Sequence, residues 1–405
     1  MFKIGIIREG KVPPDARTPL TPDQCVGILQ AFPVEMVVEP SPVRCYKDEE
    51  FEAKGIPLST DLNDCDVLIG VKEVPVDRLI PGKTYLFFSH TIKKQAQNRR
   101  MLQTILDKKI RLIDFEKLTD NEGDRIIAFG FYAGLVGTHN GLWTFGRRTG
   151  RFSMPRMYQS HDYAQVKAGY AQLQLPPLRI VLTGGGRVAS GAVRNRHDMG
   201  IQQVSPRDFL TKNYKQAVFT QLFAQDYAQH REGPRIFNLE HFYTHGEEYV
   251  SMFAPYAKRA DLFINGIFYD KKAPAFFTLA EMAGPEFNIQ VIADISCDLM
   301  PGSSVPSTIR ASSIAEPVYG FNRYTGEECA PYTPDCVDVM AIDNLPSELP
   351  RDASNFFGSQ LIDNVLPELI HTFDSPIIQR ATIAEHGHLT EPYRYLADYV
   401  AEQVV

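Results

Sequence analysis

Ionisable side chains follow three apolar segments in the first third of the chain. Lys72 and Glu73 come after residues 67–71, His90 after residues 85–89 and Glu116 after residues 111–115. An amine, an imidazole and carboxylates are groups that carry out general acid–base chemistry. Taken singly, each is more often a capping or surface group. Together they indicate a site, because ligands bind at the carboxyl ends of parallel strands and charges packed there need partners.

An arginine in an early loop suits a carboxylate ligand. Arg17 ends the proline-containing loop 13–17, and a planar guanidinium can donate two parallel hydrogen bonds to one carboxylate. The alternative is an ion pair with Asp15 at the surface. The mildly acidic charge balance does not oppose a carboxylate substrate, because one or two well-placed arginines suffice.

A glycine-rich turn is the clearest local motif. Residues 179–183 have the composition of a buried strand, and the pattern Gly184-x-Gly186-x-x-Ala189 then opens a helix that runs to about residue 199. Such glycines permit a tight turn and let backbone N–H groups approach a pyrophosphate at the helix N-terminus. The motif predicts dinucleotide binding by Gly184, Gly186, Arg187 and Val188, with a purely structural turn as the alternative.

The next predicted strand bears on the choice of cofactor. It covers residues 201–204 and is followed by Ser205 and Arg207, with no carboxylate at the point where an acid would bind the adenosine ribose. A small hydroxyl with a nearby arginine suits a 2′-phosphate, so NADP(H) is favoured over NAD(H). The alternatives are that Asp208 shifts into place or that Arg207 is simply solvated.

Alternating strands and helices must position these residues. Predicted strands cover residues 2–7, 34–38, 67–71, 84–88, 111–114, 179–183, 262–265 and 290–294, and predicted helices cover 22–32, 94–108 and 353–371. This alternation predicts an α/β fold of two Rossmann-like, doubly wound parallel-sheet domains with an interdomain cleft. Residues 1–140 and 350–405 would form the substrate and catalytic domain, and residues 141–349 the dinucleotide-binding domain. The polar segment between residues 204 and 260 is expected to decorate the second domain, and the sequence assigns no role to residues 205–255.

Composition excludes several classes of protein. The chain has 405 residues, Lys+Arg 42 against Asp+Glu 49 and a formal charge of −7, so nucleic acid is not the expected partner. Six scattered cysteines without a CxxC pair indicate free, reduced thiols and no metal site. No apolar run approaches the ~20 residues of a membrane span, and none resembles a signal peptide. We therefore expect a cytoplasmic protein that does not bind membranes.

Long blocks of the sequence resemble a known family. The blocks are residues 70–75, 83–93, 111–117, 128–134, 262–267, 293–298, 342–346 and 387–390. They are similar to the saccharopine dehydrogenases and lysine–2-oxoglutarate reductases, which are relatives of alanine dehydrogenase and the transhydrogenase nucleotide-binding subunit. The similarity is greatest to the reductase half of the bifunctional aminoadipic semialdehyde synthase, so the chain resembles a free-standing reductase.

The resemblance implies a reaction and roles for residues. An NAD(P)-dependent enzyme would interconvert lysine plus 2-oxoglutarate and saccharopine, through an imine that accepts hydride. Lys72 and His90 would be the acid–base pair, and Glu73 and Glu116 would tune their protonation. Further implied contacts are Arg17 and Arg125 with substrate carboxylates, Phe129 as an apolar wall, and Asn265 and Asp294 near the nicotinamide. Closure of the two domains would exclude water from the imine.

Some alternatives remain open at this point. Asp124 precedes Arg125 where some relatives have two basic residues, so one carboxylate contact is in doubt. An alanine dehydrogenase acting on pyruvate and ammonia would share Lys72 and His90. A dinucleotide-binding protein without catalysis would retain the glycine turn. The sequence fixes neither the physiological direction nor the oligomeric state, although a homo-oligomer is compatible with the family.

Overall fold

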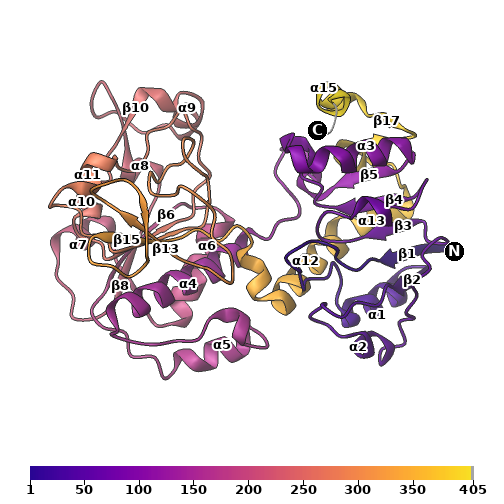
Figure 1. Ribbon diagram of the computed structural model, residues 1–405, viewed down its shortest axis with the longest axis horizontal. Helices are drawn as coiled ribbons and strands as arrows, with labels where there is room; N and C mark the ends of the chain where they lie inside the picture. The colour runs from indigo at the N-terminus through magenta and orange to yellow at the C-terminus, as the bar shows by residue number, and fades with distance from the viewer. Residues whose placement is uncertain (403–405) are drawn as a thin grey trace. The chain divides into compact units, whose positions relative to one another are not determined.

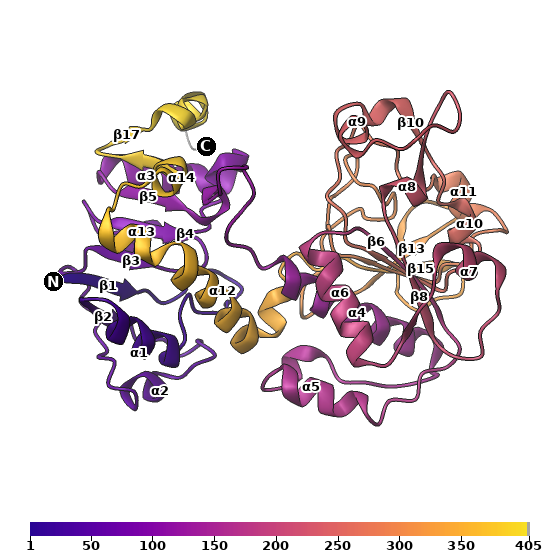
Figure 2. The same cartoon turned by 180° about the vertical axis from the view of Figure 1, so that it is seen from behind.

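The computed structural model describes residues 1–402, which form two compact units. The first unit comprises Met1–Phe129 together with the segment from Pro350 onward, and the second comprises Gly130–Leu349. In Figures 1 and 2 the indigo N-terminal part and the yellow C-terminal part of the chain lie together in the first unit. Each unit contains one main sheet that is largely parallel. The predicted α/β class with two parallel-dominated sheets is therefore confirmed.

The first unit has a seven-stranded sheet in the order β17-β16-β5-β4-β3-β1-β2. Strands β2, β1, β3, β4 and β5 are parallel, whereas β16 and β17 are antiparallel additions at one edge. The strands are β1 (Phe2–Ile6), β2 (Val34–Val38), β3 (Val67–Ile69), β4 (Thr84–Phe87), β5 (Arg111–Asp114), β16 (Thr382–Glu385) and β17 (His388–Leu389). The helices are α1 (Pro22–Ala31), α2 (Asp48–Glu52), α3 (Arg99–Asp107), α12 (Pro350–Asn364), α13 (Leu366–His371), α14 (Pro376–Ala381) and α15 (Ala397–Ala401).

Local sequence signals set several boundaries in this unit. Thr21 caps α1 through a capping box with Gln24, and Pro22 begins the helix where a missing N–H costs nothing. The predicted helix over residues 94–108 begins only at Arg99, after two short 3-10 turns. The predicted helix over residues 353–371 is divided at Val365, because Pro367 lies in the first turn of α13 and cannot continue the hydrogen-bond ladder.

The second unit has an eight-stranded sheet in the order β14-β13-β15-β12-β11-β6-β8-β7. The six strands from β15 to β7 are parallel, and β13 and β14 are antiparallel additions. The strands are β6 (Arg179–Thr183), β7 (Gln202–Gln203), β8 (Val218–Leu222), β11 (Leu262–Asn265), β12 (Val291–Asp294), β13 (Tyr319–Asn322), β14 (Glu328–Cys329) and β15 (Cys336–Met340). The helices are α4 (Gly130–Thr149), α5 (Tyr163–Tyr170), α6 (Arg187–Asp198), α7 (Pro206–Thr211), α8 (Ala224–Tyr227), α9 (Leu239–Thr244), α10 (Ala254–Ala257) and α11 (Leu279–Ala283).

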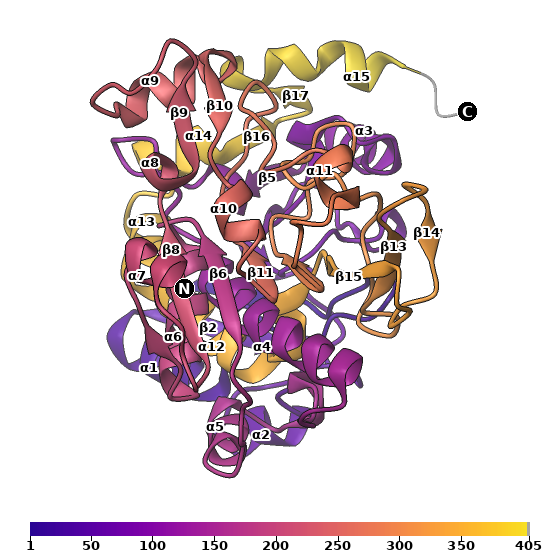
Figure 3. The ribbon, with the colours of Figure 1, turned by 90° about the vertical axis from the view of Figure 1, so that its left-hand side faces the viewer.

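The segment 205–255 is more than a surface decoration. It contributes β8, whose Val218, Phe219 and Leu222 are buried, between β6 and β7 of the main sheet. It also forms a separate antiparallel hairpin of β9 (Ala228–His230) and β10 (Tyr249–Ser251), with α9 between its strands. Figure 3 shows this hairpin and α9 standing beyond the end of the sheet. The expectation of a purely peripheral segment is therefore wrong for β8.

Two cysteines form a disulfide that the sequence did not predict. Cys329 and Cys336 are joined, whereas Cys25, Cys45, Cys65 and Cys297 are free. Strands β14 and β15, which carry the pair, both flank β13. Gly320 of β13 lies opposite Cys329, and a side chain there would come within 2.8 Å of the Cys329 sulfur. The prediction of six free thiols is wrong because a seven-residue spacing gives no local motif.

Candidate active site

The carboxyl ends of β3, β4 and β5 bring the predicted catalytic residues to one edge of the first sheet. The three strands are parallel neighbours with continuous pairing. Lys72 and Glu73 follow β3, His90 follows β4 and Glu116 follows β5. The residues are thus near one another because parallel strands end at the same edge.

His90 and Glu73 form a hydrogen-bonded pair. Nδ1 of His90 lies 2.5 Å from Oε1 of Glu73, and both side chains are largely buried. Burial opposes ionisation of Glu73, but the hydrogen bond and charge of His90 lower its pKa to about 2. A carboxylate can only accept, so Nδ1 carries the hydrogen and Nε2 is the nitrogen that can exchange a proton. His90 also has φ +53°, a conformation that non-glycine residues rarely adopt.

Lys72 has a depressed pKa because of its surroundings. Burial is the largest cause, and the positive charges of Arg17 and Lys11 act in the same direction, so that the pKa falls to about 8. Asp15 and Glu73 oppose this shift without cancelling it. A lysine with this pKa exchanges a proton close to neutral pH.

Glu9 belongs to the same cluster, although sequence reasoning did not select it. Its two carboxylate oxygens accept the backbone N–H groups of Val71 and Lys72 at 2.7 and 2.8 Å. Burial raises the pKa of Glu9 to about 7, despite those two hydrogen bonds. Glu9 follows β1, which is the neighbour of β3 in the sheet. The rule that selected Lys72 would therefore have found Glu9 had it been applied to the first strand.

Glu116 lies among cations rather than beside His90 directly. Its carboxylate contacts Lys93 at 3.1 Å and Arg125 at 3.3 Å. Burial opposes ionisation, but these two charges lower the pKa of Glu116. Its backbone N–H donates to Asp114, which is fully buried, has its own pKa raised by burial, and accepts from Ser89. This network fixes the loops after β4 and β5.

Arg17 is buried rather than at the surface. Its guanidinium donates to both carboxylate oxygens of Asp15, at 2.9 and 2.6 Å, and only 2% of the residue is exposed. The guanidinium carbon lies 4.3 Å above the Phe129 ring, which in turn stacks on Phe357 with centroids 4.6 Å apart. The predicted contacts of Arg17, Arg125 and Phe129 with substrate stay predictions.

The glycine turn of the second unit is a tight turn that leads directly into α6. Gly184 has φ +111°, and a Cβ there would lie 2.6 Å from the Gly266 carbonyl oxygen, so glycine is required. Gly186 precedes α6 as its N-cap, and a Cβ there would meet no atom within 4 Å. Glycine at position 186 is thus not demanded by packing. Open space in front of a helix N-terminus is where a pyrophosphate binds.

Helix α6, which begins with Arg187 and Val188, is held close to α4. A Cβ on Gly134 would lie 1.7 Å from the Val188 carbonyl oxygen, and one on Gly191 would lie 1.8 Å from that of Phe131. Glycines therefore allow the two backbones to approach each other directly. This contact fixes the direction of α6 relative to the glycine turn.

Asn265 and Asp294 are buried and bonded to each other. The Asn265 side-chain amide donates to Asp294 at 2.9 Å and accepts from the Thr183 hydroxyl at 3.0 Å. Asp294 also accepts from Thr308 at 2.7 Å, and burial raises its pKa. Both residues are 0% exposed. A role toward a cofactor, as predicted, would therefore act through the strand ends that these bonds hold.

The structure corrects the position assigned to Ser205 and Arg207. They follow β7, which is the edge strand, whereas the neighbour of β6 is β8. The Ser205 hydroxyl accepts from the Asp208 N–H and caps α7, and Arg207 is exposed. The sequence interpretation took consecutive strands to be adjacent, but β8 inserts between them. The strand end beside the glycine turn is thus that of β8.

Residues 1–402 contain neither a helix that could span a membrane nor a metal-binding cluster of side chains. No helix in this range combines the length and apolar character needed to cross a membrane. Within the same range, no group of three or more His, Cys, Asp or Glu side chains is arranged to hold a metal ion.

Comparisons with known proteins confirm the resemblance seen in the sequence. Residues 5–136 match the family described as alanine dehydrogenase/PNT, N-terminal domain. The chain is 30% identical over 444 residues to an alpha-aminoadipic semialdehyde synthase of Arabidopsis thaliana, covering 97% of this chain and 41% of that protein. It is 27% identical over 382 residues to a saccharopine dehydrogenase (NAD(+), L-lysine-forming) of Emericella nidulans, covering 90% and 91%.

A solved structure supports the fold. The chain matches an L-alanine dehydrogenase with a TM-score of 0.68 and 14% identity, over 99% of this chain and 100% of that one. At this identity the likeness establishes the architecture alone. The chain spans less than half the length of the aminoadipic semialdehyde synthases that it matches.

Proposed function

We propose that this chain, a homologue of saccharopine dehydrogenases and aminoadipic semialdehyde synthases, is an oxidoreductase of lysine metabolism. It would interconvert lysine plus 2-oxoglutarate and saccharopine with a nicotinamide dinucleotide. The first unit would be the substrate and catalytic domain, and the second the dinucleotide-binding domain. The names of the relatives support the reaction class. The cluster of ionisable residues at the strand ends (Lys72, Glu73, His90 and Glu116), here called the strand-end cluster, supports the assignment of the chemistry to the first unit.

The observation that carries the proposal is the combination of Lys72 with the His90–Glu73 pair. Lys72 has a pKa lowered to about 8, and Nδ1 of His90 is held by a carboxylate with a pKa of about 2. Condensation of an amine with a keto acid needs several proton transfers, to activate the amine and to remove water from the carbinolamine. Two proton-exchanging groups of different character on adjacent strands suit that requirement.

The residues of the chain take the following roles in the proposal. Lys72 in its neutral form accepts a proton from the substrate ammonium, which frees the nitrogen to attack the keto carbon. Nε2 of His90 protonates the leaving hydroxyl of the carbinolamine, while Glu73 stabilises the charged imidazole. Arg17 and Arg125 hold substrate carboxylates, and Phe129 provides an apolar surface. Glu116 moderates the charge of Arg125 and Lys93.

The second unit fits a dinucleotide at the turn formed by Gly184 and Gly186. Gly184 is required by its backbone conformation, whereas Gly186 leaves open space in front of the α6 N-terminus. When bound, a reduced nicotinamide supplies the hydride that the substrate imine accepts. Asn265 and Asp294 hold the ends of β11 and β12 through their mutual hydrogen bond.

A preference for NADP(H) over NAD(H) remains part of the proposal. The two residues that suggested this preference in the sequence, Ser205 and Arg207, follow β7, and β8 lies between β7 and β6. The fungal relative bears NAD(+) in its name. The preference therefore depends on residues that follow β8.

A direct assay tests the proposed function. Loss of absorbance at the nicotinamide band would be followed with lysine, 2-oxoglutarate and either NADPH or NADH, and with pyruvate plus ammonia as the alternative substrate pair. We expect turnover only with lysine and 2-oxoglutarate. Turnover with pyruvate and ammonia would favour an alanine dehydrogenase, and dinucleotide binding without turnover on either pair would exclude an enzyme of this class.

A further inference from the structure

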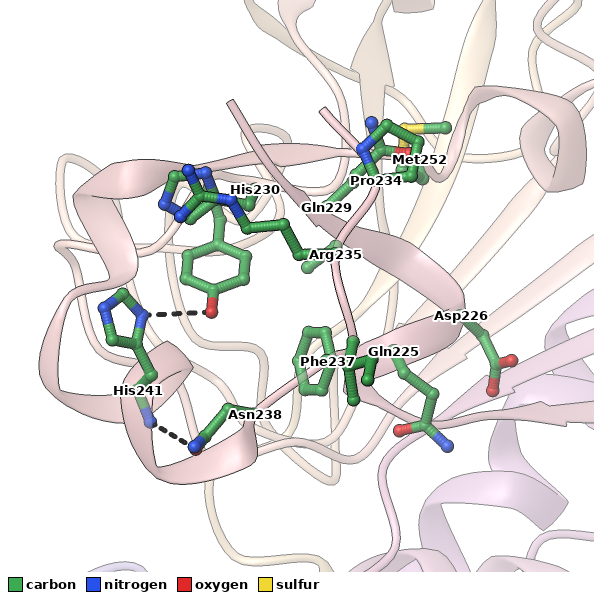
Figure 4. Close-up of a pocket in the computed structure, with 13 residues that line it drawn as sticks. Gln225, Asp226, Gln229, His230, Pro234, Arg235, Phe237, Asn238, His241 and Met252 are labelled. Carbon is green, nitrogen blue, oxygen red and sulfur yellow. Dashed lines mark hydrogen bonds between the residues drawn. The ribbon is translucent and has the colours of Figure 1, made fainter. Parts of the chain in front are cut away.

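A cavity of about 400 Å³ lies in the second unit between α8, the β9–β10 hairpin and α9. Figure 4 shows side chains from all three elements around it. Its volume is within the range of about 300–1,000 Å³ that is usual for small-molecule sites. None of the residues that line it belongs to the strand-end cluster or to the glycine turn.

The cavity lies just after the end of β8, at the point where this part of the chain contacts the glycine turn. The Gln221 side chain donates to the Gly184 carbonyl oxygen at 2.8 Å. A Cβ on Gly185 would lie 2.9 Å from the Phe223 ring, so this ring lies against the turn. Gln225 and Asp226, two and three residues further on, line the cavity. In a dinucleotide-binding fold the adenosine ribose lies at the end of the strand beside the glycine turn, and here that strand is β8.

The walls of the cavity suit a flat, nitrogen-rich ring. Phe237 and Tyr249 line it with ring centroids 5.8 Å apart and planes inclined at 64°. The Tyr249 hydroxyl is bonded to His241 at 3.1 Å, which fixes the ring in place. The Gln225 amide can both donate and accept, as the edge of an adenine base requires. Of the two rings, the half-buried Phe237 offers the face that can stack on a base, because Tyr249 is only 4% exposed.

An arginine and a histidine line the same cavity. Arg235 and His230 are among its lining residues, and Figure 4 shows both side chains at its upper side. Arg235 pairs with Glu232, and His230 lies 3.1 Å from Glu248. The carboxylates of both pairs are exposed, and exposed pairs of this type contribute little, so a phosphate can replace them at small cost. The nearby Asp226 carboxylate already accepts the Phe223 N–H at 2.8 Å.

We propose that this cavity receives the adenosine end of the dinucleotide, with Phe237 and Tyr249 beside the base and Arg235 on the 2′-phosphate of NADP(H). The inference rests on the proposed function, since it concerns the same cofactor. It assigns the choice between NADP(H) and NAD(H) to the hairpin inserted after β8. Ser205 and Arg207 take no part in it.

Calorimetric titration of the full chain tests the assignment. The probes are NADPH, NADH, 2′,5′-ADP, 5′-AMP and inorganic phosphate, with wild type, Arg235→Ala and Phe237→Ala. The matched controls are Arg231→Ala, whose side chain bonds to the Glu247 carbonyl oxygen, and Tyr243→Ala, an exposed residue of α9. Neither control residue lines the cavity.

We expect Arg235→Ala to weaken the binding of NADPH and 2′,5′-ADP about 10- to 100-fold, as for the loss of a charged hydrogen bond. The affinities for NADH and 5′-AMP should change less than about twofold. Phe237→Ala should weaken the binding of all four nucleotides about fivefold or more, because it removes a stacking surface. The two controls should leave every affinity unchanged.

Each other outcome overturns the assignment in a distinguishable way. Equal losses for NADPH and NADH in Arg235→Ala, or wild-type binding of NADH as tight as that of NADPH, would exclude a 2′-phosphate contact. A separate anion site would be indicated if Arg235→Ala weakens the binding of inorganic phosphate while Phe237→Ala leaves the binding of 5′-AMP unchanged. Wild type that binds no dinucleotide would exclude the proposed function as well.

Discussion

At the scale of single residues, Lys72 is the group whose protonation should control the rate near neutral pH. Its pKa is lowered to about 8, so the neutral amine is scarce at pH 6 and abundant at pH 9. We predict that kcat/KM for lysine and 2-oxoglutarate rises with pH between pH 6 and 9, with its midpoint near pH 8. Lys72→Met should lower turnover about 10²- to 10⁴-fold, the usual contribution of one acid–base group. Steady-state rates between pH 6 and 9 measure both effects, and near-wild-type turnover in this variant would contradict the assigned role.

His90 gives a second test at the same scale. We predict that His90→Ala also lowers turnover about 10²- to 10⁴-fold, because it removes the imidazole that Glu73 orients. Dinucleotide affinity should not change, since His90 belongs to the other unit. The exposed His161 provides a control, and His161→Ala should retain full activity. A loss of dinucleotide binding in His90→Ala would show that the variant is misfolded or that the role is wrong.

Arg196 is a buried cation whose guanidinium has no hydrogen-bond partner among residues 1–402. It is 0% exposed, and among residues 1–402 none of its three guanidinium nitrogens has a hydrogen-bond partner. Burial lowers its pKa to about 9, and its guanidinium lies 4.0 Å above the Phe219 ring. We predict that Arg196→Met raises the free energy of unfolding by about 1–4 kcal/mol, because a similar volume is kept and the desolvated charge is removed.

The check on Arg196 is chemical denaturation at neutral pH. Arg196→Lys keeps a buried charge and should give no gain in stability. If Arg196→Met proves less stable than wild type, the contact of the guanidinium with Phe219 would outweigh its desolvation.

Glu9 shows what residue-level prediction achieved and missed. Strand-end position and residue type were enough to select Lys72, Glu73, His90 and Glu116, which the sheet brings to one edge. Glu9 was missed, although it follows β1 and accepts two backbone hydrogen bonds from the loop that carries Lys72. Such side-chain-to-backbone bonds have no sequence pattern, because their partners lie more than 60 residues apart.

At the scale of elements, the crossing of α4 and α6 depends on Gly134. A Cβ there would lie 1.7 Å from a backbone oxygen of α6, which cannot move aside as a side chain can. We predict that Gly134→Ala lowers the free energy of unfolding by about 1–3 kcal/mol or more and weakens dinucleotide binding, since α6 begins at the glycine turn. Thermal unfolding and NADPH titration measure the two effects.

A glycine of α5 provides the matched control. A Cβ on Gly169 would meet no atom within 4 Å, so Gly169→Ala should be neutral or stabilise by up to ~1 kcal/mol. Equal effects of the two substitutions would mean that the close approach of the helices does not limit stability.

Local composition explains which elements could be predicted from the sequence and which were missed. Strands β2 and β6 were predicted at their observed bounds, because they are short, apolar and bordered by turn residues. Helix α4 was missed because five glycines break its helical signal, although Gly134, Gly137 and Gly141 allow close packing. Strand β8 was missed because a threonine and a glutamine interrupt its apolar run.

At the scale of the whole molecule, the first unit is built from two segments that lie far apart in the sequence, one before residue 130 and one after residue 349. Phe357 and Leu361 of α12 belong to the same core as Leu20, Ile28 and Phe115. We predict that residues 130–349 expressed alone unfold cooperatively, because they contain a complete sheet and its cores. Residues 1–129 alone should lack a cooperative transition, since α12, α13 and β16 are missing. Circular dichroism melts of both fragments measure this, and a cooperative melt of residues 1–129 would contradict it.

The return of the chain to the first unit also sets an order of events on the ribosome. The strands β1 to β5 leave the exit tunnel early, but β16 covers the edge of β5 only after more than 250 further residues. At about 5–20 residues per second this interval is roughly 10–50 s. During that time the apolar edge of a parallel sheet would be open to pairing with other nascent chains. Chaperone binding to the nascent N-terminal segment is therefore expected to matter most before residue 385 is synthesised.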